Sequence, residues 1–254
     1  MKETGILFTG DMIQAVLDGR KTMTRRVAKN QSNGGIYRRP DGLYTYTQCG
    51  GVAVGLPFSC PYGQPGDSLY VKETWQTGSN LDKYNATEIK AKAQEAGYST
   101  GPDSFNVHYP PCPLWYPIDG TYRSWGDDDI ASFGNPGRKR SPRFMPRWAA
   151  RIILQITEVR VERLQSVTNE DAQREGTPHA YPHRHGPDGI IKDGENPDPY
   201  GLAHETGWAD CWVCAFTELW DSINKERGFS WVVNPYVWVI SFKRIGSINN
   251  ECHQ

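Results

Sequence analysis

The sequence predicts an α+β protein in which short strands form a small mixed β-barrel with a few short helices. Apolar and polar residues alternate over 68–75, and a further apolar strand is expected over 236–243. Along 151–163 the apolar positions keep one parity as far as Ile156 and change to the other at Val159. Such a switch indicates a bulge or a sharp bend, which is a means of curling a sheet into a barrel.

Short helices are expected between these strands. The stretch 11–18 places its apolar residues on one face and is followed by a glycine, which favours the left-handed stop of a helix. The stretch 168–175 opens with the cap pattern Thr-Asn-Glu-Asp and ends before Gly176. Another helix is expected near 86–96, and Asp210 is expected to cap a last one.

One domain is expected over residues 1–245, followed by a loose tail at 246–254, because strands from both ends of the chain must assemble one sheet. Three polar stretches without clear period, near 28–63, 77–137 and 177–208, are predicted as insertions. The residues expected in the core are Leu69, Val71, Trp75, Ile152, Leu154, Ile156, Trp238 and Ile240.

The chain has a formal net charge of -1, yet its arginines are clustered, and no acidic residue occurs between 130 and 157. A clustered run is often only a solvated face. Because the planar fork of arginine fits phosphate oxygens, the clusters nevertheless predict a surface for nucleic acid. The residues expected in this surface are Arg20, Arg25, Arg26, Arg138, Lys139, Arg140, Arg143, Arg147 and Arg151.

No targeting segment or membrane span is expected. Residues 1–8 lack a basic region followed by an apolar run, and no stretch approaches the ~20 apolar residues of a membrane span. The protein is therefore expected in the cytoplasm, with reduced cysteines. Cys211 and Cys214, with the histidines before them, are an alternative zinc site, but a second Cys-x-x-Cys pair is missing. No metal and no cofactor are predicted.

Four blocks, in order along the chain, carry a family resemblance. They are Leu17-Asp-Gly-Arg-Lys-Thr-Met-Thr-Arg-Arg26, Pro65-Gly-Asp-Ser-Leu-Tyr-Val-Lys-Glu-Thr-Trp75, Met145-Pro-Arg-Trp-Ala-Ala150 continued through Ile156, and Leu219-Trp-Asp-Ser-Ile223 with Asn234-Pro-Tyr-Val-Trp-Val239. With their flanking elements they cover about 100 of the 254 residues. In these blocks the chain resembles the ASCH-domain proteins of phages and prophages. Their fold is similar to the PUA domain, a small mixed barrel associated with RNA.

The resemblance implies a hydrolase that acts on an amide bond at an exocyclic nitrogen of a modified nucleobase or nucleoside. The best-defined enzymes of the family are small bacterial amidohydrolases that remove the acetyl group from N4-acetylcytidine. They use a base, a nucleophile and an acid, and these roles fall here on Lys21, Thr24 and Glu175. A phage-encoded protein of this kind is expected in the cytoplasm of the bacterial host.

The chemistry of this set is coherent. A threonine hydroxyl is a poor nucleophile until a base takes its proton, and a lysine is a base only where burial or nearby cations lower its pKa. Arg20, Arg25 and Arg26 are such cations. Residues three apart on an extended strand point to opposite faces. Lys21 and Thr24 can therefore converge only if the turn after the first helix continues through Lys21.

Other interpretations stay open at this point. By parity Glu73 shares the apolar face of its strand, which makes it a second acid candidate. Its alternative role is a buried salt bridge to an arginine such as Arg151 or Arg26. In the non-catalytic alternative, the residues at these three positions, Lys21, Thr24 and Glu175, are ordinary surface residues. The whole chain is alternatively a non-catalytic RNA- or DNA-binding module, or a ribonuclease. The expected partners are nucleic acid, RNA before DNA, or a modified nucleoside.

Overall fold

The computed structural model describes residues 1–29, 31, 34–47, 53–95, 114–123, 135–177, 181–185 and 207–247. Contacts divide the chain into two compact units, each assembled from separate stretches of sequence. Unit 1 comprises Met1–Gln14, Gly66–Gln155 and Lys243–Gln254, and unit 2 comprises Ala15–Pro65 and Ile156–Phe242.

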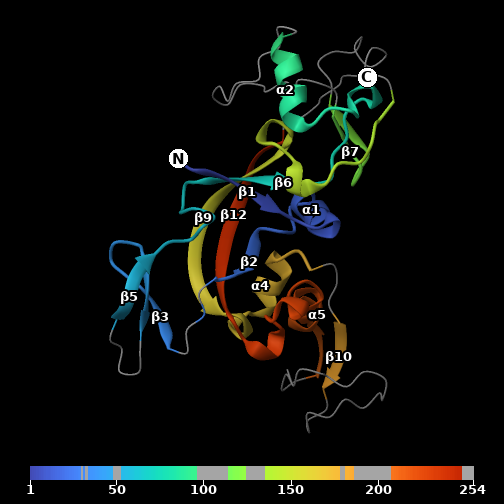
Figure 1. Ribbon diagram of the computed structural model, residues 1–254. Coiled ribbons are helices and arrows are strands. Elements are labelled where there is room, and N and C mark those ends of the chain that lie inside the picture. Colours follow the sequence, from blue (N-terminus) through green and yellow to red (C-terminus); the bar gives the residue numbers. More distant parts are fainter. Residues whose placement is uncertain are drawn as a thin grey trace. The chain divides into compact units, whose positions relative to one another are not determined.

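The protein has mixed α and β structure, as the sequence predicted. Its main sheet has five strands in the order β1-β6-β9-β12-β2. β1 (Glu3–Leu7) runs parallel to β6 (Ser68–Lys72), whereas β2 (Met23–Val27) is antiparallel to β12 (Tyr236–Ser247). β9 (Ile152–Arg163) and β12 are the long strands, and both follow a curved path in Figure 1.

Unit 1 contains β1, β6 and the start of β9, in which Leu69 pairs with Leu154 and Tyr70 with Ile153. Trp75 and Tyr116 are among its fully buried side chains, together with Met145. These residues form a core to which the unit's α-helix contributes Ile89. The other elements of this unit are η1 (Ser79–Leu81), α2 (Ala86–Glu95), β7 (Leu114–Tyr116), β8 (Thr121–Arg123), η2 (Pro142–Phe144) and η3 (Arg147–Ala149).

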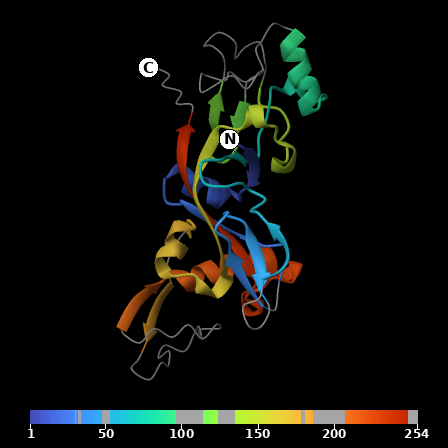
Figure 2. The same cartoon turned by 90° about the vertical axis from the view of Figure 1, so that its left-hand side faces the viewer.

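Unit 2 contains β2, most of β9 and of β12, and two helices that lie side by side in Figures 1 and 2, α4 (Asn169–Arg174) and α5 (Trp212–Asn224). Met23 of β2, with Val237 and Val239 of β12, packs in one cluster with apolar residues of both helices. This cluster defines the helix face of the sheet. The shorter elements are η4 (Leu164–Ser166), β10 (Tyr181–His185), β11 (Gly207–Cys211), η5 (Lys225–Arg227) and η6 (Trp231–Val233).

The other face of β12 in unit 2 meets a separate three-stranded sheet, β3 (Gly35–Arg38), β4 (Tyr44–Thr47) and β5 (Ala53–Phe58). The ring of Tyr44 lies edge-on to that of Trp238, with 4.9 Å between their centroids. Side chains alternate between the two faces of a strand, so Trp238 points away from the helix face that Val237 and Val239 occupy. This sheet occupies a stretch predicted as a loop or hairpin insertion.

All eight residues predicted in the core are buried; five of them lie in unit 1, and Ile156, Trp238 and Ile240 lie in unit 2. The change of parity in β9 is also confirmed: Ile156 and Val159 are buried, and the two residues between them are exposed. α1 (Gly10–Leu17), α2 and α4 form within one or two residues of their predicted ends. At the start of α5 the side chain of Asn169 accepts hydrogen bonds from the first two helical N–H groups, while the side chain of Asp210, the predicted cap, lies outside the described residues.

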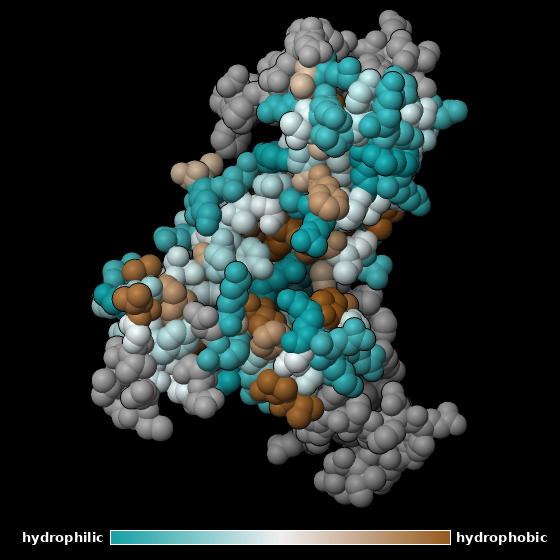
Figure 3. Space-filling model, in the orientation of Figure 1, coloured by the Kyte–Doolittle hydropathy of each residue, from teal (hydrophilic) through white to brown (hydrophobic). Residues whose placement is uncertain are grey.

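The described surface is largely hydrophilic on the face that Figure 3 presents, with apolar residues in small groups. The most exposed of the large apolar side chains include Leu56, Phe144 and Val232. Nowhere in the described ranges is a helix both long enough and apolar enough to cross a membrane. Most of the predicted tail, and large parts of the stretches 77–137 and 177–208, lie outside the described residues.

Candidate active site

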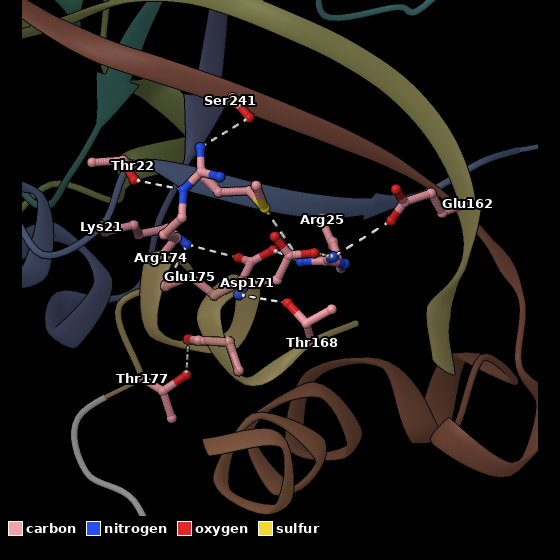
Figure 4. A network of polar contacts seen from close by, with 12 residues as sticks. Lys21, Thr22, Arg25, Glu162, Thr168, Asp171, Arg174, Glu175, Thr177 and Ser241 are labelled. Atoms are coloured by element: carbon pink, nitrogen blue, oxygen red, sulfur yellow. Dashed lines mark hydrogen bonds and ion pairs between the residues drawn. The ribbon is translucent and has the colours of Figure 1, made fainter. Parts of the chain in front are cut away.

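Lys21 and Glu175, which are 154 residues apart in sequence, meet in unit 2 (Figure 4). The Lys21 ammonium donates to Oε2 of Glu175 at 2.9 Å and to the backbone carbonyl of the same residue at 2.6 Å. Their side chains are 0% and 4% exposed. The structure thus brings together two of the residues to which the sequence assigned catalytic roles.

The chain before β2 is folded so that Lys21 reaches this position. Gly19, with a left-handed φ of 77°, ends α1, and the Lys21 N–H then donates to the carbonyl of Ala15 at 2.9 Å. The turn after the helix therefore continues through Lys21, as convergence with Thr24 required. Next, the Thr22 N–H donates to the carbonyl of Arg174 at 2.9 Å, which ties this loop to the end of α4.

Glu175 is placed by the end of the same short helix. It is the C-cap residue of α4, and Gly176 follows it with a φ of 78°. The hydroxyl of Thr168 accepts from the Asp171 N–H at the other end of the helix, as the cap pattern predicted. A six-residue helix is too short to be stable alone, so its contacts with its neighbours hold the acid in place.

Burial changes the electrostatics of Lys21. Desolvation of the ammonium lowers the pKa of Lys21 below its ordinary value of 10.5, against the opposing effect of the Glu175 carboxylate. The positive charges of Arg26 and Arg25 lower it further. A lysine with a depressed pKa loses its proton more readily and becomes a competent base.

Arg25 joins the same site from β2. Its guanidinium lies 3.3 Å from Oε1 of Glu175, 2.6 Å from Oδ2 of Asp171 and 3.5 Å from Oε2 of Glu162. The side chain is 0% exposed. Arg160 in turn contacts both Glu162 and Asp171, so the site stands on a continuous network of alternating charges.

Thr24 is also in β2, opposite Ile240, and is 2% exposed. Arg25 contacts Met23 and Glu175, so the side chain of Thr24 points to the other face of the strand. The contacts of Arg25 with Glu175 thus lie on one face of β2 and the side chain of Thr24 on the other, so the structure does not bring the Thr24 hydroxyl to the Lys21–Glu175 contact.

Glu73 belongs to unit 1, where it forms a two-pronged ion pair with Arg151. The Arg151 Nε and Nη2 donate to the two carboxylate oxygens at 2.9 Å and 2.8 Å, and Asp119 accepts from Nη1 at 2.8 Å. Burial raises the pKa of the Glu73 carboxyl, and the contacts with Arg151 oppose that rise. Glu73 thus forms the buried salt bridge with Arg151 that was its alternative role.

The arginines expected to bind nucleic acid divide into two groups. Arg25, Arg140 and Arg151 are buried with protein partners; Arg140, for example, donates to the carbonyls of Tyr84 and Leu81. Their inclusion in a phosphate-binding surface is corrected accordingly, because their side chains are buried in the protein. Arg26 is half-buried, and Arg20 and Arg147 are in ion pairs at 3.1 Å and 2.7 Å. The exposed cations left are Arg138, Lys139 and Arg143.

Three residues of the network were missed by sequence reasoning, namely Arg160, Glu162 and Asp171. The signals were present in the sequence. Asp171 and Glu175 are four apart, which places both carboxylates on one side of a helix. The alternation Glu158-Val-Arg160-Val-Glu162 places three charges on one face of a strand.

No metal-binding group of three His, Cys, Asp or Glu residues occurs within the described ranges. The Cys214 side chain is buried in α5. The side chain of Cys211 and those of the histidines of the alternative zinc site lie outside the described residues.

Comparison of the chain with protein-family models, with curated proteins and with solved structures found no match. The ASCH resemblance stays a prediction, carried by the four sequence blocks.

Proposed function

We propose that this protein is a hydrolase of the ASCH type, with a PUA-like barrel, that removes an acyl group from an exocyclic nitrogen of a modified nucleobase. The single observation that carries the proposal is the buried contact between the Lys21 ammonium and the Glu175 carboxylate, 2.9 Å apart. Two ionisable groups held together out of water, with a cation whose pKa is depressed, are typical of a site for proton transfer.

In the proposed reaction the neutral amine of Lys21 takes the proton of the Thr24 hydroxyl as its oxygen attacks the acyl carbon. The C–N bond to the exocyclic nitrogen then breaks, and the leaving nitrogen receives a proton from Glu175. The acyl group remains as an ester on Thr24. Proton transfer from the Lys21 ammonium to the Glu175 carboxylate restores the neutral amine. Water then attacks the ester and gives a proton to this amine, which returns a proton to the departing Thr24 oxygen as the carboxylic acid is released. Thr24 lies on the face of β2 opposite to that of Arg25, so the reaction requires that substrate binding bring its hydroxyl within hydrogen-bond reach of the Lys21 amine.

The charge balance of the site is compatible with these roles. An ammonium beside a carboxylate has the same total charge as a neutral amine beside a carboxylic acid. Transfer of one proton across the 2.9 Å contact therefore converts the ion pair into the base and the acid that the reaction requires. Burial favours the neutral amine of Lys21, because desolvation penalises its ammonium form.

The proposal is tested by incubating the protein with a panel of N-acylated nucleosides and oligonucleotides, and analysing products and protein by mass spectrometry. Release of the free nucleobase amine, with a transient acyl adduct on Thr24, is the expected result. Thr24→Val and Lys21→Met are each expected to abolish turnover, and Glu175→Gln to slow it by roughly 10²–10⁴-fold, while substrate binding persists. Binding without turnover by the wild-type protein would instead identify a non-catalytic binding module.

A further inference from the structure

The carboxylate of Glu175 is held at both of its oxygens by two different cations. Oε2 lies 2.9 Å from Nζ of Lys21, and Oε1 lies 3.3 Å from Nη1 of Arg25 (Figure 4). The terminal torsion of a glutamate is otherwise broad, so a carboxylate with one partner can turn. The second contact therefore decides which oxygen faces the lysine.

Arg25 is itself immobilised. Its Nη2 is 2.6 Å from Oδ2 of Asp171, its Nη1 is 3.4 Å from the sulfur of Met23, and its guanidinium carbon is 5.8 Å from the ring centroid of Phe216. Asp171 and Glu175 lie on one side of α4, one turn apart. A planar guanidinium can span two such carboxylates, whereas the single ammonium of a lysine cannot present the same fork.

We propose that Arg25 is a positioning residue, whose guanidinium fixes the Glu175 carboxylate against the Lys21 amine. With a side chain that is 0% exposed, Arg25 acts through Glu175 and does not touch the substrate. The inference rests on the proposed function where it concerns turnover. Its structural part, that the state of Lys21 depends on Arg25, is measurable without a substrate.

The network allows Arg25 to be replaced without leaving a carboxylate unpaired. In Arg25→Gln, Glu175 retains its ion pair with Lys21. Asp171 and Glu162 retain their ion pairs with Arg160. The matched control is Arg160→Gln. It makes the same chemical change in a residue that also contacts Asp171, and whose other ion pairs are with Glu158 and Glu162 and not with Glu175. Arg25→Lys retains the charge and loses the fork.

Kinetics on an N-acylated nucleoside separate positioning from a general structural role. Arg25→Gln is expected to lower kcat roughly 10²-fold, the effect of a misplaced reacting group, with KM close to that of the wild type. Arg25→Lys is expected to restore only part of kcat, and Arg160→Gln to keep kcat within a few-fold. Equal losses of kcat in Arg25→Gln and Arg160→Gln, or full recovery in Arg25→Lys, would overturn the inference.

A titration of the Lys21 side chain by NMR provides the measurement that needs no turnover. The charged groups that face Lys21 are Glu175, Arg26 and Arg25. Removal of the Arg25 charge is expected to move the midpoint of the Lys21 titration to higher pH, whereas Arg160→Gln leaves it unchanged. An unmoved midpoint in Arg25→Gln also overturns the inference. If the wild-type protein hydrolyses no acylated nucleoside, the proposed function fails and the titration alone decides the role of Arg25.

Discussion

Gly176 packs directly on Lys21, and no side chain fits between them. A Cβ added at Gly176 would lie 2.8 Å from the Cβ of Lys21 and 2.7 Å from the Cβ of Ala15. The backbone of Gly176 is also left-handed, with a φ of 78°. The residue after the candidate acid thus sets how closely the loop that carries the candidate base approaches α4.

Gly176→Ala is expected to destabilise the protein and to displace Lys21 from Glu175. The control is Gly228→Ala, at a φ of 82° with no atom near the added Cβ, which isolates the cost of a left-handed alanine, about 1 kcal/mol. Urea unfolding should show a larger loss for Gly176→Ala than for the control, and only Gly176→Ala should lower turnover. Equal losses of stability in Gly176→Ala and Gly228→Ala would mean that the loop moves without cost to accommodate the added Cβ.

The reaction is expected to slow at high pH. The reacting form of the Lys21–Glu175 pair holds one proton, and the pair loses it with the pKa of Lys21, which burial lowers from 10.5, so kcat/KM should fall through a midpoint below pH 10.5. A pH–rate profile checks this, with Arg25→Gln expected to shift the midpoint upward. A rate that still rises through this range would contradict the assignment of the acid and base.

The same depressed pKa of Lys21 links stability to pH. Between the folded-state pKa of Lys21 and its ordinary value of 10.5, the unfolded chain binds more protons than the folded one. The free energy of unfolding therefore gains from this group as pH rises across that window. The free energy of unfolding of the wild type, measured over this pH range, should increase relative to that of Lys21→Met. A decrease of the wild-type free energy of unfolding relative to the variant would contradict this prediction.

The sequence predicted the elements better than it predicted their surroundings. The parity of β9, the stop at Gly19 and the Thr168 cap depend on neighbours along the chain, so periodicity and residue type reveal them. The capping of α5 by Asn169 joins residues 43 and 44 positions apart, and such a contact leaves no local signal.

The sequence indicated residues that belong to the site, but it did not indicate which residues they contact. The resemblance to the ASCH proteins assigned roles to Lys21 and Glu175, whose contact the structure shows. Arg25 was expected on a phosphate-binding surface, because its cluster of cations carries no local sign of burial. Its acidic partners come from β9 and α4, more than a hundred residues away. Only tertiary packing could show which arginines face inward.

Glu73→Gln is expected to act on stability. The change removes the carboxylate that pairs with the buried guanidinium of Arg151 and leaves that guanidinium its ion pair with Asp119. Breaking a buried ion pair in this way typically costs about 3–5 kcal/mol of stability. The double variant Glu73→Gln with Arg151→Met should recover part of that loss in urea unfolding. If Glu73→Gln keeps full stability and abolishes turnover, Glu73 is instead a catalytic acid.

Binding to oligonucleotides, where present, is expected to use the exposed cations of unit 1. Arg138, Lys139 and Arg143 are exposed, so replacing all of them by Gln should flatten the plot of log affinity against log salt concentration by about two to three units. Lys225→Gln, at an exposed site of unit 2, is the control for a charge change elsewhere. An unchanged slope in the triple variant would remove this segment from the nucleic-acid surface.

The Asn169 side chain couples the local opening of two helices. Its oxygen accepts from the N–H groups of Trp212 and Val213, at 3.1 Å and 3.2 Å, while its backbone begins the short helix that ends at Glu175. Fraying of α4 therefore releases both N–H groups at the start of α5. Hydrogen exchange at these two amides consequently reports how often the segment that carries Glu175 unfolds while the rest of the protein stays folded.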